Sequence, residues 1–196
     1  MLNKLKKAAL IGSGLLVLAG CSSESADDAS VNSEAVGAET LVVGLDDTFA
    51  PMGFRDENNE IVGFDVDLAK AVGERIGAEI VFQPIDWAMK ETELDSGNID
   101  MIWNGYAITP ERAEKVLLSE PYIVDAQSII VLKDSAIETK ADLEGKLVST
   151  QQSSSSVDKI MEDESGIFGK LGGDLVLYPS NNNAFSDLES GRVDAI

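Results

Sequence analysis

The chain has 196 residues, of which 44% are hydrophobic and 26% charged, as in a soluble globular protein with one large domain or two small ones. Lys and Arg number 15 against 35 Asp and Glu, so the net charge of −20 disfavours binding to nucleic acids and to anionic lipid surfaces. The chain has no His and a single Cys, which excludes His-based catalysis, His metal sites, internal disulfides and Cys-cluster metal sites. The composition therefore predicts an acidic protein without zinc or redox chemistry, and we expect no metal and no cofactor.

Residues 1–20 have the layout of a secretory signal peptide, which is not part of the fold. Lys4, Lys6 and Lys7 precede a short apolar run over residues 8–19. This run is shorter than the ~20 apolar residues that a membrane-spanning helix needs. Removal of the segment would change the net charge from −20 to −23, because it contains three lysines and no acidic residue.

The sequence Leu18-Ala19-Gly20-Cys21 resembles the lipobox of bacterial lipoproteins. The resemblance implies that cleavage makes Cys21 the new N-terminus and that its thiol carries a diacylglyceryl group, with palmitate among the acyl chains. An ordinary secretory peptide with a coincidental Cys is the alternative. We expect the lipid on Cys21 to anchor the protein to the outside of the bacterial cell membrane, because so acidic a chain has no electrostatic attraction to lipid.

Residues 21–39 are rich in Ser, Ala and acidic side chains and contain no basic or aromatic residue. This composition predicts a disordered acidic tether between lipid and domain, with a short helix as the alternative.

The segment that follows alternates strands and helices. The apolar run 41–45 predicts a buried strand, and residues 46–54 and 56–60 predict a loop and a turn. A helix is predicted from Asp65, its N-cap, to Ile76, with Gly77 as its C-terminal stop.

The alternation continues toward residue 115. Residues 79–83 predict a strand, Asp86 caps a helix that ends at Gly97, and residues 99–103 predict another strand. Thr109-Pro110 opens a third helix with Pro at its first position. Such alternation favours parallel βαβ units in an α/β sheet.

The pattern then restarts. The further segments are an apolar run at 126–132, strands at 146–150 and 175–178, and helices at 154–164 and 184–190. Residues 188–196 also repeat the pattern of residues 94–102, with Gly, Asp and apolar residues at matching positions. This internal repeat favours two lobes of like architecture, lobe 1 over 40–126 and lobe 2 over 127–196. The alternative is that two helix-to-strand junctions are similar independently of each other. Because Ile196 ends an apolar strand, we expect a truncated chain whose return to lobe 1 is missing.

Several segments in order resemble the extracellular solute-binding proteins, family 3, of polar amino acid ABC transporters. They are residues 44–54 with 62–69, residues 100–112 with 119–122, residues 151–155 and residues 187–195. The resemblance extends from Thr40 to Ile196. It implies a periplasmic-binding-protein-like type II fold, with two α/β lobes, a hinge near Asp125–Ile130 and a ligand cleft between the lobes.

The resemblance also implies a set of ligand-binding residues. The matching positions are Asp46, Phe49, Trp87, Asn104, Gly105, Ala107, Arg112, Gln151, Ser154 and Ser155. In the family, the position of Arg112 binds the ligand carboxylate and that of Asp46 binds the ammonium. Chemistry agrees, since a carboxylate prefers a bidentate guanidinium, and Asp46 follows the carboxyl end of a strand, where α/β sheets hold ligands.

Each assignment has an ordinary structural alternative. Arg112 could pair with a nearby Glu on the helix surface, Asp46 could serve a turn, Trp87 could pack within lobe 1, and Ser154 could act only as an N-cap. Two positions depart from the family: Ala107 replaces the usual Ser or Thr, and Ser153 replaces the usual Gly. The second departure puts the local backbone geometry in question.

The sequence therefore predicts the substrate-binding lipoprotein of an amino acid importer. We expect it to be a monomer that captures a free amino acid and delivers it to an ABC permease and its ATPase. One alternative is an enzyme on the same fold, of the cyclohexadienyl dehydratase kind, although fold alone does not decide function. A ligand-sensing ectodomain is the other; the lipobox argues against it.

Overall fold

The computed structural model describes residues 39–196, which lie in one unit that runs from Ala35 to Ile196. The predicted signal peptide, the lipidated Cys21 and the tether up to residue 38 lie outside the described residues.

The elements follow the predicted alternation of strands and helices. The strands are β1 (Thr40–Leu45), β2 (Thr48–Phe49), β3 (Gly53–Arg55), β4 (Ile61–Val62), β5 (Glu79–Pro84), β6 (Met101–Ile102), β7 (Ser149–Gln151) and β8 (Val176–Tyr178). The α-helices are α1 (Phe64–Ile76), α2 (Lys90–Asp95), α3 (Pro110–Lys115), α4 (Ser155–Met161) and α5 (Asn181–Glu189). The 3₁₀ helices are η1 (Trp87–Met89), η2 (Lys140–Leu143) and η3 (Ile167–Lys170).

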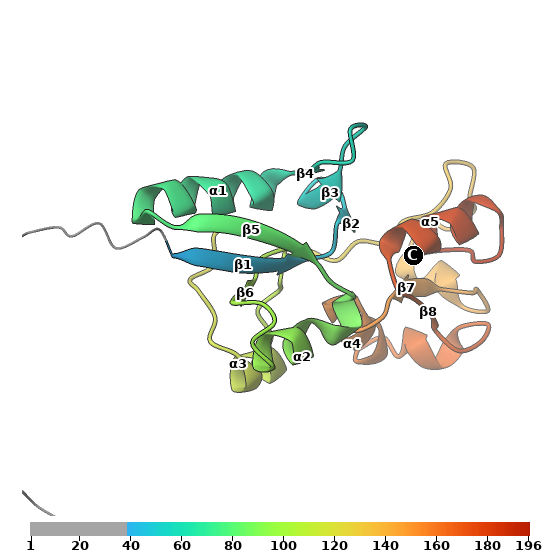
Figure 1. Cartoon of the computed structure of the whole chain (residues 1–196). Helices are drawn as coiled ribbons and strands as arrows, with labels where there is room; N and C mark the ends of the chain where they lie inside the picture. The colour runs from blue at the N-terminus through green and yellow to red at the C-terminus, as the bar shows by residue number, and fades with distance from the viewer. Residues whose placement is uncertain (1–38) are drawn as a thin grey trace, which may run out of the picture. The chain divides into compact units, whose positions relative to one another are not determined.

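In the N-terminal half, residues 40–126, the main sheet is parallel and has the order β5-β1-β6. Strand β1 lies between β5 and β6, and its carboxyl-terminal half is buried, with Val43 and Leu45 fully buried. Figure 1 shows α1 on one side of β1 and β5 and α2 on the other. The carboxyl ends of β1 and β6 therefore carry Asp46 and Asn104 at the same edge of the sheet.

The predicted loop 46–54 contains more structure than the sequence suggested. It carries β2 and the start of β3, which pair antiparallel, and β3 pairs in turn with β4. The turn predicted at 56–60 is confirmed, with Asn59 in the left-handed region at φ 65°.

The prediction that Asp65 caps α1 was wrong. The N-cap is Gly63, and Asp65 lies inside the first turn with its side chain buried. An N-cap carboxylate would accept hydrogen bonds from N–H groups of its own helix, whereas the Asp65 carboxylate accepts bonds from Gly105 N and Tyr122 Oη. Gly77 ends the helix in the left-handed conformation at φ 74°, as predicted.

In the C-terminal half, residues 127–196, β7 and β8 pair in parallel. Val148 forms a parallel bridge to Ala195, and Ile196 exchanges two backbone hydrogen bonds with Ile130. The buried core of this half is formed by Ile137, Leu143, Val148, Ile167 and Ala195.

Predicted elements of this half differ from the structure in their bounds, and α4 ends at Met161 rather than near residue 164. Strand β7 begins at Ser149 rather than residue 146, and α5 begins at Asn181 rather than 184, because Ser180 accepts a bond from Asn183 N and caps the helix. The apolar run 126–132 forms no regular strand, and only Ile130 pairs, with Ile196.

The two repeated segments, residues 94–102 and 188–196, adopt the same helix-to-strand junction. Gly97 and Gly191 both have φ 72° and follow α2 and α5. Asp100 then accepts a bond from Val42 N at 2.7 Å, and Asp194 accepts one from Leu147 N at 2.8 Å. The backbone N–H groups of the same two Asp residues donate to Val42 O and Leu147 O. The likeness thus includes the hydrogen bonds of each aspartate as well as the glycine cap.

Candidate functional site

Asp46 lies directly after β1 and is 7% exposed. Its Oδ1 accepts bonds from the N–H of Thr48 at 2.9 Å and the hydroxyl of Thr48 at 2.6 Å. Its Oδ2 accepts a bond from Gln151 Nε2 at 2.6 Å. Asp46 therefore serves a local turn, as the structural alternative held, and also contacts the other half of the chain.

Asn104 supports Asp46 from the end of β6. Its Oδ1 accepts a bond from Asp46 N at 3.1 Å, and its side chain is 2% exposed. A Cβ on Gly53 would lie 2.7 Å from Asn104 Nδ2, so this close approach requires glycine. Asn104 thus fixes the backbone from which Asp46 projects.

Gly105 and Phe49 lie together. A Cβ on Gly105 would lie 3.2 Å from Phe49 Cε1, and Gly105 has φ 58°. The N–H of Gly105 donates to Asp65 Oδ2 at 2.7 Å. Burial raises the pKa of Asp65, and the bonds from Tyr122 and Gly105 oppose that rise. This contact ties the loop after β6 to α1.

Arg112 lies in the first turns of α3, which Thr109 caps by accepting a bond from Arg112 N. The guanidinium is buried, and its carbon lies 4.2 Å from the centroid of the Tyr106 ring. Nη1 donates to Ala107 O at 3.0 Å and Nη2 to Ser153 O at 3.3 Å. The guanidinium thus bonds main-chain carbonyls, in contrast to the predicted alternative of a solvated Arg paired with a Glu.

Trp87 is 6% exposed and packs edge-on against Tyr106, with ring centroids 6.1 Å apart. The structure thus places Trp87 in the core of the N-terminal half and also beside the Arg112 cluster, because Tyr106 contacts both.

Gln151 ends β7 and is 4% exposed. Its Nε2 also donates to Pro179 O at 3.1 Å, which fixes the amide toward Asp46. Ser154 is the N-cap residue of α4, yet its hydroxyl donates to Gln151 O at 2.7 Å and caps no N–H. Ser155 begins α4.

Ser153 adopts φ 56°, in the region that favours glycine. The chain therefore keeps here the backbone geometry that a glycine would allow, despite the substitution. This conformation presents the Ser153 carbonyl to Arg112 and Lys90.

Three neighbours of this cluster were missed by sequence reasoning: Lys90, Glu91 and Tyr106. Lys90 is 2% exposed, and Glu91 accepts a bond from the Tyr106 hydroxyl at 2.9 Å. A sequence signal existed, because positions 87, 90, 91 and 94 fall on one face of the helix predicted from Asp86 to Gly97, and two of them are charged. In the structure this predicted helix is divided into η1 and α2.

Burial lowers the pKa of Lys90, and the Glu91 carboxylate partly opposes this change. Burial raises the pKa of Glu91, but the bond from Tyr106 and the Lys90 charge together outweigh it and lower the pKa. Burial and Glu91 raise the pKa of Tyr106. The Tyr106 hydroxyl and the Lys90 ammonium thus stabilise the charged form of Glu91.

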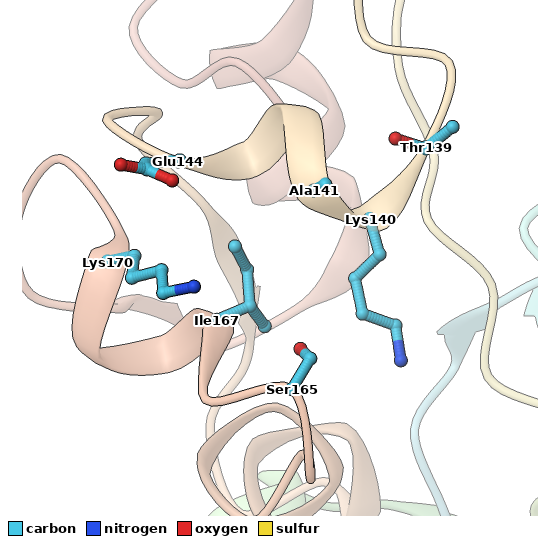
Figure 2. A pocket seen from close by; sticks show the side chains of 7 residues that line it. All are labelled: Thr139, Lys140, Ala141, Glu144, Ser165, Ile167 and Lys170. Carbon is cyan, nitrogen blue, oxygen red and sulfur yellow. The ribbon is translucent and has the colours of Figure 1, made fainter.

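A separate pocket of about 330 Å³ lies between η2 and η3. Figure 2 shows its lining side chains, none of which belongs to the predicted site. Six of the seven lining residues are exposed, and its Lys140 pairs with Asp163. We place the candidate site at Asp46 and Arg112 instead, because buried charged groups gather there.

Two further features concern residues 39–196 alone. No group of three or more His, Cys, Asp or Glu in this range could hold a metal ion. No helix in this range has the length and apolar character needed to cross a membrane.

The family model of the bacterial extracellular solute-binding proteins, family 3, matches residues 41–182. The L-cystine-binding protein TcyJ of Escherichia coli K12 is 29% identical over 198 residues, covering 100% of this chain and 72% of that protein. The ABC transporter arginine-binding protein 1 of the same strain is 33% identical over 168 residues, covering 86% of this chain and 66% of that protein.

Among solved structures, a substrate-binding protein of an ABC uptake transporter from Streptococcus pneumoniae, with bound histidine, matches with a TM-score of 0.77. It is 39% identical, and the match covers 80% of this chain and 64% of that one. The predicted type II fold is confirmed by this likeness. The chain spans about two thirds of the length of these relatives.

Proposed function

Because the chain belongs to the bacterial extracellular solute-binding proteins, family 3, we propose that it binds a free amino acid for an ABC importer. The relatives named above are a cystine-binding, an arginine-binding and a histidine-bound protein, and the latter two are components of ABC transporters. We propose that a permease and its ATPase receive the ligand from this chain. We propose no enzymatic activity, since these relatives are named as binding proteins.

The observation that carries the proposal is that one short segment joins two buried, oppositely charged side chains. Gln151 bonds Asp46, and the Ser153 carbonyl bonds Arg112. A zwitterionic amino acid needs an anion for its ammonium and a guanidinium for its carboxylate. We propose that Asp46 and Arg112 fill these roles, and that the ligand ammonium competes with Gln151 Nε2 for Asp46 Oδ2.

We propose that the other predicted residues complete the cleft. Phe49 and Trp87 would contact the ligand side chain, the main chain from Asn104 to Ala107 would donate to its carboxylate, and Ser154 and Ser155 would approach it from the other half. Ala107 has no hydroxyl, so only its backbone can contribute.

We propose that residues 40–126 and 127–196 move as two lobes about a hinge near Asp125–Ile130. The contacts of Gln151 with Asp46 and of Ser153 with Arg112 would then belong to the closed form, and they would break when the lobes open.

We also propose that the protein is a monomer anchored outside the cell membrane by lipid on Cys21. The supporting observation is the lipobox sequence, with the single Cys of the chain at the position where this motif requires it.

A thermal-shift screen of the full chain with the twenty common amino acids and L-cystine tests the function. A ligand at 100 times its dissociation constant should add about 2.7 kcal/mol to the free energy of unfolding. L-arginine, L-histidine and L-cystine are the first probes. The Arg112→Ala variant should lose the shift, and no shift with any amino acid would contradict the proposal.

A further inference from the structure

The ammonium of Lys90 is the feature that the proposed function leaves unexplained. Lys90 is 2% exposed, and its Nζ lies 5.2 Å from the centroid of the Trp87 ring. It donates to Trp87 O at 3.1 Å within its own half and to Ser153 O at 3.0 Å in the other half. A buried cation that bonds a carbonyl across the chain's two halves needs a physical reason, because its burial is costly.

Lys90 belongs to a closed ring of contacts. Its Nζ pairs with Glu91 Oε2 at 3.1 Å, and Glu91 Oε1 accepts the bond from Tyr106. The Tyr106 ring stacks on the Arg112 guanidinium, and Arg112 donates to Ser153 O, the carbonyl that Lys90 also bonds. Only the Ser153 carbonyl comes from the C-terminal half.

The charges of the ring suit one anion. Lys90 and Arg112 supply two positive charges and Glu91 one negative charge, so a single carboxylate would make the cluster neutral. Removing Lys90 would leave Glu91 without its cation and reduce the attraction for that carboxylate. Lys90 itself is enclosed by Trp87 and Ser153, so its effect on a ligand passes through its neighbours.

We propose that Lys90 is a positioning residue of the cleft, which holds the Ser153 carbonyl against the N-terminal half and keeps the Arg112 guanidinium in place through Glu91 and Tyr106. This inference rests on the proposed function, since it concerns the same cleft. Once a carboxylate binds Arg112, the ring keeps the two halves together, so Lys90 acts mainly on the rate of ligand release.

The test compares Lys90→Met, which keeps the aliphatic stem, with Lys90→Arg, which keeps a cation and its donors. Lys70→Met is the matched control, because Lys70 is exposed on α1 and its Nζ lies 5.8 Å from the Phe82 ring. L-arginine, L-histidine and L-cystine are the probes, with the full chain. Calorimetry gives the dissociation constant, stopped-flow Trp fluorescence gives the dissociation rate, and thermal melting gives the stability without ligand.

We expect Lys90→Met to weaken binding about tenfold or more, chiefly through faster dissociation, as for loss of a charged hydrogen bond. Lys90→Arg should restore most of the affinity, and Lys70→Met should change it less than about twofold. Combining Lys90→Met with Glu91→Gln should cost little more than Lys90→Met alone, because both break the same ring.

An unchanged dissociation constant in a folded Lys90→Met variant would overturn the inference while leaving the proposed function intact. So would a loss of affinity that Lys90→Arg does not reverse and that follows the loss of thermal stability, since this describes a purely structural residue. A wild-type chain that binds none of the three probes nor any other amino acid would overturn the proposed function and this inference together.

Discussion

The carboxylate of Asp65, in the first turn of α1, accepts a bond from the backbone N–H of Gly105, with Oδ2 and N 2.7 Å apart. The hydroxyl of Tyr122 donates to the other carboxylate oxygen at 2.8 Å. One buried side chain thus joins α1, the loop after β6 and the segment after α3. The loop it holds leads to Ala107 and Arg112, so α1 takes part in positioning the site.

Replacing Asp65 by Ala should lower the free energy of unfolding by about 3 kcal/mol, because two donors to a charged group lose their acceptor in a buried place. Urea unfolding measures the change. Asp67→Ala, an exposed change in the same helical turn, should stay within about 0.5 kcal/mol. Equal effects of the two substitutions would show that the Gly105 contact contributes little.

Stability should also depend on pH through Asp65. Because burial raises the pKa of Asp65 above its ordinary value of 3.8, the folded protein holds this proton more tightly than the unfolded chain. The resulting stability is present below the ordinary pKa and is lost as pH rises through the raised one. Relative to Asp65→Asn, which does not titrate, the wild type should therefore lose stability as the pH rises above the ordinary pKa of 3.8. Urea unfolding of both proteins at increasing pH measures this difference in the free energy of unfolding. A wild type that gains stability relative to Asp65→Asn as the pH rises would contradict the prediction.

Ser153→Gly should stabilise the fold by about 0.5–1 kcal/mol, since a left-handed conformation costs a residue with a Cβ more than it costs glycine. Asn59→Gly is the control: Asn59 also has positive φ, at 65°, but Asn tolerates this region and the gain should be smaller. Thermal melting of the wild type and of the two variants measures both changes in stability. A destabilised Ser153→Gly variant would mean that the serine side chain contributes more than the backbone strain costs.

Arg112→Ala should weaken amino acid binding by roughly 2–5 kcal/mol, because a buried ligand carboxylate would lose its charged partner. Arg75→Ala, at the exposed end of α1, should leave the affinity unchanged. Calorimetry with the ligand found in the thermal-shift screen measures both variants, and a loss of less than about tenfold for Arg112→Ala would remove Arg112 from the carboxylate site.

Cys21→Ser should release the protein from the membrane fraction, because acyl chains provide the proposed attachment and the strongly acidic chain is repelled by anionic lipid. Ser22→Ala, next to it in the sequence, should leave the protein in the membrane fraction. Fractionation followed by a salt wash separates the outcomes. A Cys21→Ser protein that still sediments with membranes after the wash would contradict lipid anchoring.

Local chemistry predicted most of the elements. The apolar run 41–45 became the central strand β1, Gly77 and Gly97 ended their helices, and Thr109-Pro110 opened α3. These features depend on neighbouring residues alone, namely on capping, left-handed glycine and hydrophobic pattern. Short paired segments such as β2 and β3 were not predictable, because each exists only through its partner strand.

The sequence by itself determined the family, the alternation of strands and helices, and the places of Asp46 and Arg112 within that alternation. Only the tertiary structure decided what the charged side chains contact. Asp65 could have capped its helix but bonds Gly105, and Lys90 could have been solvated but is buried against Ser153. The physical reason is that a hydrogen bond between residues 40 or 63 positions apart forms only after folding brings them together. Such a side chain could equally well bond a group nearby in the sequence or water, so the sequence pattern alone does not predict its partner.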